Sequence, residues 1–289
     1  MKRNNIKVLE WNLNFGSYDN VVPSGFVGKY IKGFDVVILT EVRANKNLLN
    51  MIETLGYDYI CSENQGIFSN QIVITAKKEY KLKKTVGKID NDCGEIWTPD
   101  FLHGTIEVEK KKVNIIGVRV KTSEYKLRFA QIELMSTYIS AVEGSIICAG
   151  DFNSGQIRGL DDSDYTNVKN MYQYCSGSKE LSNLRFYNFH LIKELIGEKF
   201  VLKETMGEDN SWGLCERGGR LVYGLGKRVK NDLLLYSEDI TGDSSYSWKH
   251  VRENEQEYLD MLSKNHRKRG NKVEHGYPDH ARLMAEIAV

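Results

Sequence analysis

Carboxylate, amide and imidazole side chains recur in this sequence at the ends of short apolar runs of strand length. These residues are Asn12 and Asn14, Glu41, Asp151 and Asn153, Asp232, and the neighbouring pair Asp279 and His280. Such groups bind metals and transfer protons. A single Asp or Asn at a strand end is most often a turn former or a cap. Because five strands end this way, we expect the side chains to converge on one rim of a sheet, where they would be held rigidly, as catalysis requires.

The elements that must position these groups are short strands and a few helices. Apolar runs predict strands at Ile6–Leu13, Asp35–Leu39, Ile72–Ala76, Leu102–Val108, Val113–Val120, Ser145–Cys148, Asp232–Tyr236 and Ala281–Val289. Helical periodicity occurs at Ala44–Leu55, Tyr125–Val142, Phe186–Ile196 and Trp248–Leu262. Consecutive strands from Ile72 to Val120 predict antiparallel meanders. The pattern therefore predicts an α+β fold in which two sheets pack face to face with helices outside.

Length and composition limit the class of protein. The 289 residues can form one large α/β domain or two small ones, and no Pro-rich or Gly/Ser-rich linker divides them. The net charge of +1 excludes the basic body of a dedicated nucleic-acid binder, although an enzyme acting on nucleic acid needs only a local basic track. The five cysteines form no CxxC pair, which favours reduced thiols in a cytoplasmic protein. We find no secretory segment and no membrane span.

Several short motifs resemble those of the endonuclease/exonuclease/phosphatase superfamily, which includes DNase I-like nucleases and apurinic endonucleases. They are Trp11-Asn12-Leu13-Asn14, Leu39-Thr40-Glu41-Val42-Arg43, Gly150-Asp151-Phe152-Asn153-Ser154, Asn231-Asp232 and Pro278-Asp279-His280. The motifs follow the order of that superfamily and span nearly the whole chain. The resemblance implies one catalytic domain over residues 1–289, a four-layered α/β sandwich of two packed mixed sheets flanked by helices. Insertions are expected at about 154–187 and 237–277.

The resemblance also implies a divalent-metal site and a phosphate ester as the substrate. Glu41 would be the principal metal ligand, with Asn12 and Asp279 near the metal. A carboxylate is a hard oxygen ligand of the kind that Mg²⁺ and Mn²⁺ prefer. We therefore expect Mg²⁺, or Mn²⁺ in its place, as the cofactor.

The other motif residues receive catalytic roles from the same resemblance. His280 would be the general acid or base, because the ordinary pKa of imidazole lies near neutrality. Asp232 would fix the tautomer of this imidazole. Asp151 would either orient and activate the attacking water or protonate the leaving group. Asn153 and Asn12 would donate hydrogen bonds to phosphate oxygens, where charge builds up in the transition state.

Four further residues are candidates for substrate binding. Arg43 follows Glu41 in a Glu-x-Arg pattern, and it would contact phosphate or form a salt bridge at a helix start. Trp212 would stack on a base or sugar, or be an ordinary partly buried tryptophan. Asn14 replaces an aspartate that many members of the superfamily carry, which removes a charge near the metal. Arg119 stands where the superfamily usually has His or Tyr, and it could bind phosphate bidentately.

Among phosphoesterases, the sequence favours a nuclease. The segment around Asp232 lacks the Trp-Cys-Asp-Arg signature of inositol-polyphosphate phosphatases, and no apolar docking hairpin suggests a secreted sphingomyelinase. The segment between Asp232 and Asp279 contains His250-Val251-Arg252 and then Lys264-Asn265-His266-Arg267-Lys268-Arg269. These basic groups form either an arm for a polynucleotide backbone or a solvated surface. We expect a phosphodiesterase that cleaves DNA or RNA by metal-assisted attack of water, without a membrane or an obligatory protein partner. The alternatives are a phosphatase acting on a lipid, sugar or nucleotide, and a degenerate binding module.

Overall fold

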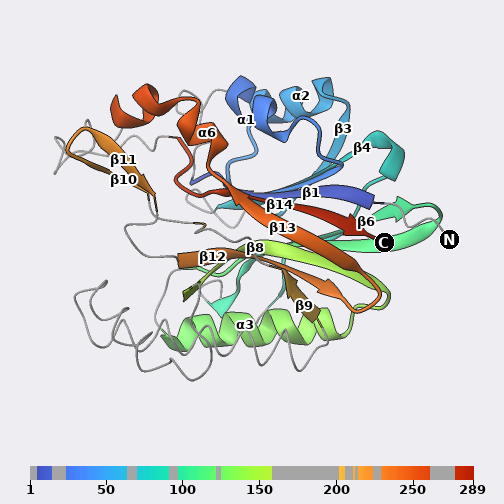
Figure 1. Ribbon diagram of the computed structural model, residues 1–289. Coiled ribbons are helices and arrows are strands. Elements are labelled where there is room, and N and C mark those ends of the chain that lie inside the picture. Colours follow the sequence, from blue (N-terminus) through green and yellow to red (C-terminus); the bar gives the residue numbers. More distant parts are fainter. Residues whose placement is uncertain are drawn as a thin grey trace.

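Two six-stranded sheets face each other in the computed structural model, with helices on the outside of both (Figure 1). The structure describes residues 5–14, 24–63, 70–90, 97–121, 125–157, 202–205, 211, 214–223, 229–260 and 277–289. In this part of the chain the layers run helix, sheet, sheet, helix, so the expected four-layered sandwich is confirmed. The expected helix Phe186–Ile196 lies outside the described residues, as does almost all of the insertion expected at 154–187.

The first sheet is mixed and contains both ends of the described chain. In spatial order its strands are β13 (Thr241–Ser247), β14 (Arg282–Ala288), β1 (Asn5–Asn12), β2 (Val36–Val42), β4 (Gln71–Lys77) and β3 (Tyr57–Cys61). Strands β1 and β2 are parallel, with α1 (Ser24–Ile31) in their connection, and the other neighbours are antiparallel. Helix α2 (Lys46–Thr54) connects β2 to β3. Both helices lie on the outer face of this sheet (Figure 1).

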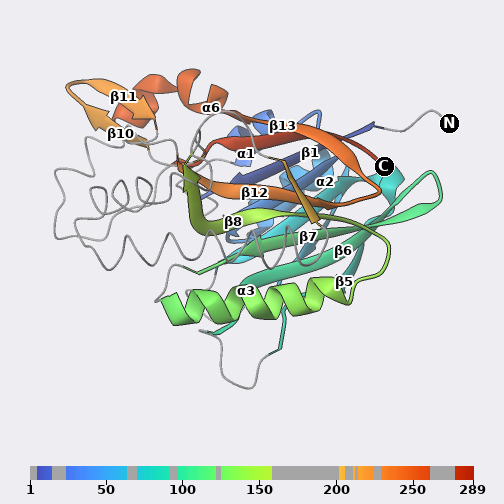
Figure 2. The same cartoon turned by 60° about the horizontal axis from the view of Figure 1, so that its bottom comes forward.

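The second sheet is also mixed. In spatial order its strands are β5 (Lys83–Val86), β6 (Asp100–Val108), β7 (Lys111–Arg119), β8 (Ser145–Ile157), β12 (Val229–Ser237) and β9 (Leu202–Thr205). Strands β5 to β7 form the expected antiparallel meander, whereas β7 and β8 are parallel. Helix α3 (Tyr125–Ser140) connects β7 to β8 and runs along the outside of this sheet (Figure 2).

Smaller elements complete the described part. They are η1 (Lys78–Tyr80), the hairpin of β10 (Leu214–Arg217) and β11 (Arg220–Tyr223), and α6 (Lys249–Arg252). None of the described helices is both long and apolar enough to cross a membrane.

The core between the sheets is built from one face of each strand. Side chains alternate along β1, so that Ile6 and Val8 are buried between the sheets while Trp11 packs with the residues of α1 and α2. The sheets approach closely at Gly117 on β7, because a Cβ there would lie 2.7 Å from Cγ2 of Ile72. An alanine at this position would force the two sheets apart, so Gly117 sets their spacing.

Strand direction brings the polar residues of the motifs to one end of the sandwich. Parallel pairing places Asn12 of β1 beside Thr40 of β2. On the second sheet, Asp151 of β8 lies between Arg119 of β7 and Asp232 of β12. The antiparallel strand β12 thus delivers its aspartate to the same end as the parallel strands, although Asp232 lies in the middle of β12 and not at its start.

The expected helix Trp248–Leu262 is interrupted. Helix α6 is only one turn long, and helical backbone resumes after a turn. Asn254 explains the break, because its side-chain Nδ2 donates to the carbonyl oxygen of His250 at 2.6 Å and to Oη of Tyr30 at 2.8 Å. The backbone N–H of Asn254 bonds instead to Val251 O. A local side-chain bond therefore replaces the backbone bond that a continuous helix would make.

His250 on α6 is fully buried among aromatic rings. Its ring meets Trp11 edge-on, with 4.9 Å between centroids, and stacks on Trp248 at 6.1 Å. Neither ring nitrogen has a hydrogen-bond partner of good geometry among the described residues. Burial, followed by the charge of Arg282, lowers the pKa of His250 to about 3. The imidazole is therefore neutral in the folded protein.

Acid is expected to destabilise the protein through His250. The unfolded chain binds a proton near the ordinary pKa of 6.5, whereas folded His250 binds one only near 3. Between these values the unfolded state holds more protons, so the free energy of unfolding falls as pH drops, by up to about 1.4 kcal/mol per pH unit. In denaturant unfolding at a series of pH values, His250→Phe should remove this share of the slope. If the free energy of unfolding of His250→Phe depended on pH as steeply as that of the wild type, His250 would not be the cause. A smaller pH dependence from His103 should remain, because burial lowers its pKa as well.

Candidate active site

Glu41 lies near the end of β2 in a backbone conformation that is rare for its residue type. Its φ is 51°, in the left-handed region, and the pairing of β2 with β4 shifts register between Leu39 and Val42. Asn14 and Asn153 also have a φ of 48°. Asparagine tolerates this region better than glutamate does. Three such residues from the predicted site indicate that surrounding contacts hold these polar side chains in place.

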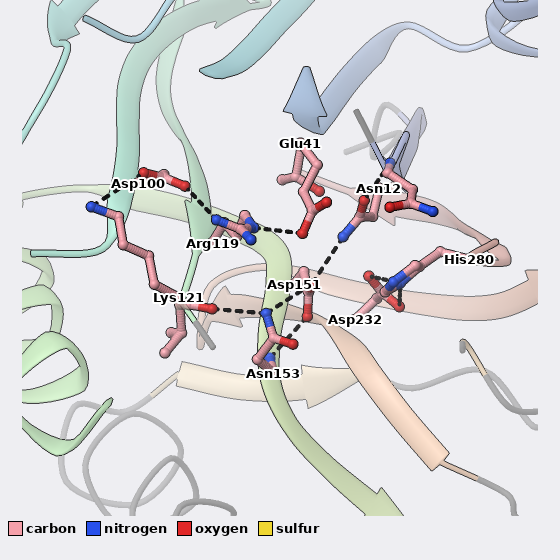
Figure 3. Close-up of polar contacts among 12 residues, drawn as sticks. Asn12, Glu41, Asp100, Arg119, Lys121, Asp151, Asn153, Asp232 and His280 are labelled. Atoms are coloured by element: carbon pink, nitrogen blue, oxygen red, sulfur yellow. Dashed lines mark hydrogen bonds and ion pairs between the residues drawn. The ribbon is translucent and has the colours of Figure 1, made fainter. Parts of the chain in front are cut away.

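His280 and Asp232 form a buried pair between the two sheets. Nδ1 of His280 lies 2.9 Å from Oδ2 and 3.1 Å from Oδ1 of Asp232 (Figure 3). Asp232 belongs to β12 of the second sheet, whereas His280 precedes β14 of the first. Burial opposes the charged imidazole, but the carboxylates of Asp232, Asp279 and Asp151 outweigh it and raise the pKa of His280 well above its usual value. The imidazole is therefore protonated at neutral pH in this arrangement.

Ser211 braces this pair, and the sequence analysis missed its role. Its Oγ accepts hydrogen bonds from the backbone N–H groups of Asn231 at 2.8 Å and Asp232 at 3.2 Å. Its carbonyl oxygen accepts from Ala281 N at 2.7 Å. The pairing of β12 with β8 is interrupted at this point by a register shift. One buried serine thus joins the segment that carries Asp232 to the segment that carries His280.

Asp151 on β8 receives three hydrogen bonds from predicted site residues. Asn12 donates through Nδ2 to Oδ2 at 2.9 Å. Asn153 donates through its backbone N to Oδ1 at 2.9 Å and through Nδ2 to Oδ2 at 3.0 Å (Figure 3). Burial, with the negative charge of Asp232 next, raises the pKa of Asp151 to about 7. A carboxyl group with a pKa near neutrality can exchange protons at physiological pH, as a general acid or base must.

Asn153 is held in place by hydrogen bonds to both its side chain and its backbone. Besides its bonds to Asp151, its Nδ2 donates to the carbonyl oxygen of Val120 at 2.8 Å. Arg128, a buried residue of α3, donates from Nη1 to the backbone oxygen of Asn153 at 3.0 Å. Both N–H groups of the Asn153 amide are therefore used within the protein. In this arrangement Asn153 positions Asp151, whereas the sequence led us to expect a phosphate contact.

Hard oxygen atoms without hydrogen bonds mark a place that fits a divalent cation. Oδ1 of Asp279 is buried and has no hydrogen-bond partner among the described residues, and none of these donates to Oε2 of Glu41. Burial raises the pKa of Asp279, His280 opposes this, and the nearby charge of Glu41 adds to it. The side-chain oxygen Oδ1 of Asn12 accepts a hydrogen bond from Asn14 N at 2.8 Å and has a second lone pair. This all-oxygen set suits Mg²⁺ or Mn²⁺, so the ligands expected from the motifs fit the cation.

A second group of possible ligands is less suited to a metal. One ligand atom from each of Asp151, Asp232 and His280 lies within 4.8 Å of the others. However, the oxygens of Asp151 already accept three hydrogen bonds, and both oxygens of Asp232 lie against His280. This group is therefore arranged for proton transfer.

Arg119 on β7 lies between two carboxylates. Its Nε donates to Oε1 of Glu41 at 2.7 Å, and its Nη1 donates to Oδ2 of Asp100 at 2.9 Å (Figure 3). Nζ of Lys121 lies 3.6 Å from the other oxygen of Asp100. Burial opposes the charge of Arg119, but Glu41 and Asp100 outweigh it and raise its pKa above the usual value. The sequence analysis missed Asp100, although it is another acidic residue at a strand end and pairs directly with Arg119.

Comparison with known proteins gives the fold a name. No protein-family model and no curated protein matches the sequence. Among solved structures, an endonuclease/exonuclease/phosphatase from Bacteroides vulgatus matches with a TM-score of 0.62 at 11% identity, over 99% of this chain and 100% of that one. The chain has the endonuclease/exonuclease/phosphatase fold.

Two further structures with this fold carry more specific names. An AP endonuclease from Archaeoglobus fulgidus matches with a TM-score of 0.59 at 14% identity, over 97% of this chain and 98% of that one. D. rerio TDP2 in complex with a single-strand DNA product also has a TM-score of 0.59, at 12% identity, over 99% of this chain and 100% of that one. The fold that the motifs led us to expect is thus confirmed.

Within the endonuclease/exonuclease/phosphatase fold of this chain, Glu10 is a further buried carboxyl group. It lies on the same face of β1 as Asn12 and accepts a hydrogen bond from Oγ1 of Thr40 at 3.2 Å. Burial, and after it the charges of Asp232 and Asp151, raises the pKa of Glu10 well above its usual value. Burial therefore favours the neutral form of Glu10, which reduces the negative charge that it adds to the site.

Of the remaining predicted residues on this endonuclease/exonuclease/phosphatase fold, some are described by the structure and others are not. Arg43 follows β2 directly and is half-buried. Trp212 lies outside the described residues, as does the basic segment at positions 264–269. The roles predicted for Trp212 and for a basic arm therefore stay predictions.

Proposed function

We propose that the protein is a divalent-metal-dependent phosphodiesterase that hydrolyses DNA or RNA. One observation carries the proposal: carboxylate oxygens of Glu41 and Asp279 that accept no hydrogen bond from a described residue lie at the same end of the sandwich as Asp151 and the Asp232–His280 pair. Nε2 of His280 lies 3.9 Å from Oδ1 of Asp279. Together these side chains supply the cation site, the proton donor and the proton acceptor that phosphodiester hydrolysis requires. The shared fold with an AP endonuclease and with a TDP2 bound to a DNA product supports a nucleic-acid substrate.

Each side chain of the site has a role in this reaction. A divalent cation bound by Glu41 and Asp279 would neutralise phosphate charge and make a nearby water more acidic. His280, held by Asp232, donates its proton to the leaving oxygen as the bond between that oxygen and phosphorus breaks. Asp151 takes the proton of the attacking water, since its pKa of about 7 suits this transfer at neutral pH.

The charge of the site favours a diester over a monoester. A phosphodiester carries one negative charge at neutral pH, whereas a terminal phosphate carries between one and two. Arg119 would be the natural partner for the additional charge, but its guanidinium is already bonded to Glu41 and Asp100. Because Arg119 is not available to neutralise a second negative charge, the site suits the single charge of a diester better than the larger charge of a monoester.

A substrate panel with purified protein tests the proposal. Single- and double-stranded DNA, abasic DNA, RNA, phosphoinositides, sphingomyelin and a chromogenic phosphodiester would be incubated with Mg²⁺, with Mn²⁺ or with EDTA. We expect cleavage of a polynucleotide in the presence of metal and none after chelation, because the acidic site depends on a cation.

The same panel separates the alternatives. Metal-replete protein that left every polynucleotide and the chromogenic diester intact would rule out the nuclease. Release of inorganic phosphate from a monoester, with polynucleotides intact, would assign a phosphatase. Protein that neither hydrolysed a substrate nor bound a metal would be a binding module.

A further inference from the structure

The two oxygens of Glu41 have different surroundings. Arg119 bonds to Oε1 at 2.7 Å, and the side chains of Glu41 and Arg119 are only 11% and 12% exposed. Figure 3 shows Asn12 on the other side of Glu41 from Arg119. None of the described residues donates to Oε2. The guanidinium therefore fills one side of this carboxylate and leaves the other for a ligand.

The guanidinium of Arg119 is itself fixed by several partners. Asp100 on β6 accepts from Nη1 at 2.9 Å. When the Asn70 amide is oriented with its oxygen toward Arg119, that oxygen lies 3.1 Å from Nη1 and 3.2 Å from Nη2. Most of the five N–H donors of the guanidinium are thus engaged. Glu41 belongs to the first sheet, Asn70 directly precedes β4 of that sheet, and Asp100 belongs to the second sheet, so these bonds hold Glu41 in place across both sheets.

Arg119 also neutralises Glu41 before any metal arrives. Arg119 and Lys121 contribute two positive charges, which balance the negative charges of Glu41 and Asp100. A divalent cation that binds Glu41 must therefore sit close to a buried guanidinium. Repulsion between the two positive charges lowers the affinity of the cation, and burial keeps solvent from screening it.

We propose that Arg119 is a positioning residue that presets Glu41 to bind a single divalent cation through Oε2, with lower affinity than an unpaired carboxylate would give. The inference rests on the proposed metal dependence of the enzyme. A second cation finds no place on Oε1, which the guanidinium covers. After accepting three hydrogen bonds, Asp151 keeps only one acceptor position, which the attacking water uses, and both oxygens of Asp232 lie against His280.

Isothermal titration calorimetry with Mn²⁺ alone tests the inference. The wild-type protein should bind one Mn²⁺ per chain, and Arg119→Gln should bind it about tenfold more tightly, because glutamine can still donate to Glu41 but carries no charge. Glu41→Gln should lose the binding. Lys121→Gln is the matched control, since Lys121 contacts Asp100 and not Glu41, and its affinity should stay near that of the wild type.

Thermal unfolding with and without Mn²⁺ gives a second readout. A ligand that binds only the folded state raises Tm more when it binds more tightly, so the shift should be larger for Arg119→Gln than for the wild type. The double variant Arg119→Gln/Asp100→Asn removes both charges of a buried pair and serves if the single variant does not fold. Mn²⁺ should likewise raise the Tm of this double variant by more than it raises the Tm of the wild type.

The outcomes separate this inference from the proposed function. Equal Mn²⁺ affinities for the wild type and Arg119→Gln, or two Mn²⁺ ions per wild-type chain, would overturn the inference and leave metal-dependent hydrolysis in place. If neither protein bound Mn²⁺, the inference and the proposed function would both fail.

Discussion

Replacing His280 with asparagine is expected to lower kcat for a phosphodiester by about 10³-fold, the usual scale for the loss of a general acid. Asparagine can still donate a hydrogen bond to Asp232, so the buried carboxylate keeps a partner, but it cannot deliver a proton. KM should change far less than kcat, because the lost interaction strengthens only as charge develops in the transition state. Steady-state kinetics of the metal-replete protein measures both constants.

A second buried histidine provides the matched control. His103 on β6 contacts Oη of Tyr138 through Nδ1 at 2.8 Å and Oδ1 of Asn114 through Nε2 at 3.0 Å, on the side of the sheet that α3 covers. His103→Gln should lower Tm and leave kcat at the wild-type level. Wild-type kcat in His280→Asn would show that His280 does not donate the proton.

Asp151→Asn is expected to lower kcat by about 10³-fold as well, for two reasons. The first is the loss of the carboxylate that takes the proton from water. The second is local geometry, because Asn12 and Asn153 both donate to Oδ2 while the backbone N of Asn153 donates to Oδ1. In either orientation of the new amide, an N–H group would face another donor, which leaves buried groups without partners.

Asp239→Asn is the control for the loss of a carboxylate charge. Asp239 accepts hydrogen bonds from Ser145, Ser237 and Lys111, near the start of β8 and away from Asp151. Its replacement should lower Tm without changing kcat. If Asp151→Asn also kept wild-type kcat under saturating metal, Asp151 would not be the base.

The sequence predicted eight of the twelve described strands of the two sheets, because these eight contain apolar runs, and it missed β3, β5, β9 and β13. Helix α1 was not predicted, since its segment contains two glycines, which disfavour an isolated helix. It forms because Val27, Tyr30 and Ile31 are buried against the first sheet. Strand β13 was also missed, because its polar sequence is typical of a loop. Its pairing with β14 makes it a strand.

The site was predictable where a residue acts from its own strand end, as Glu41 does. It was not predictable where a role depends on a partner in another strand. Ser211 is brought to the site only by tertiary contacts, so no local pattern marks it. Asp100 does stand at a strand end, but only its pairing with Arg119 shows its role. For Arg119 the sequence led us to expect phosphate as the partner, whereas the structure supplies carboxylates.

The division of the Asp232–His280 pair between the two sheets has a practical consequence. A partly denatured state could keep both sheets, and with them its far-ultraviolet circular dichroism, while their packing against each other loosened. The proton donor would then lose its carboxylate, because the two residues belong to different sheets. Enzymatic turnover should therefore be lost when the packing between the two sheets loosens, a change that far-ultraviolet circular dichroism does not detect.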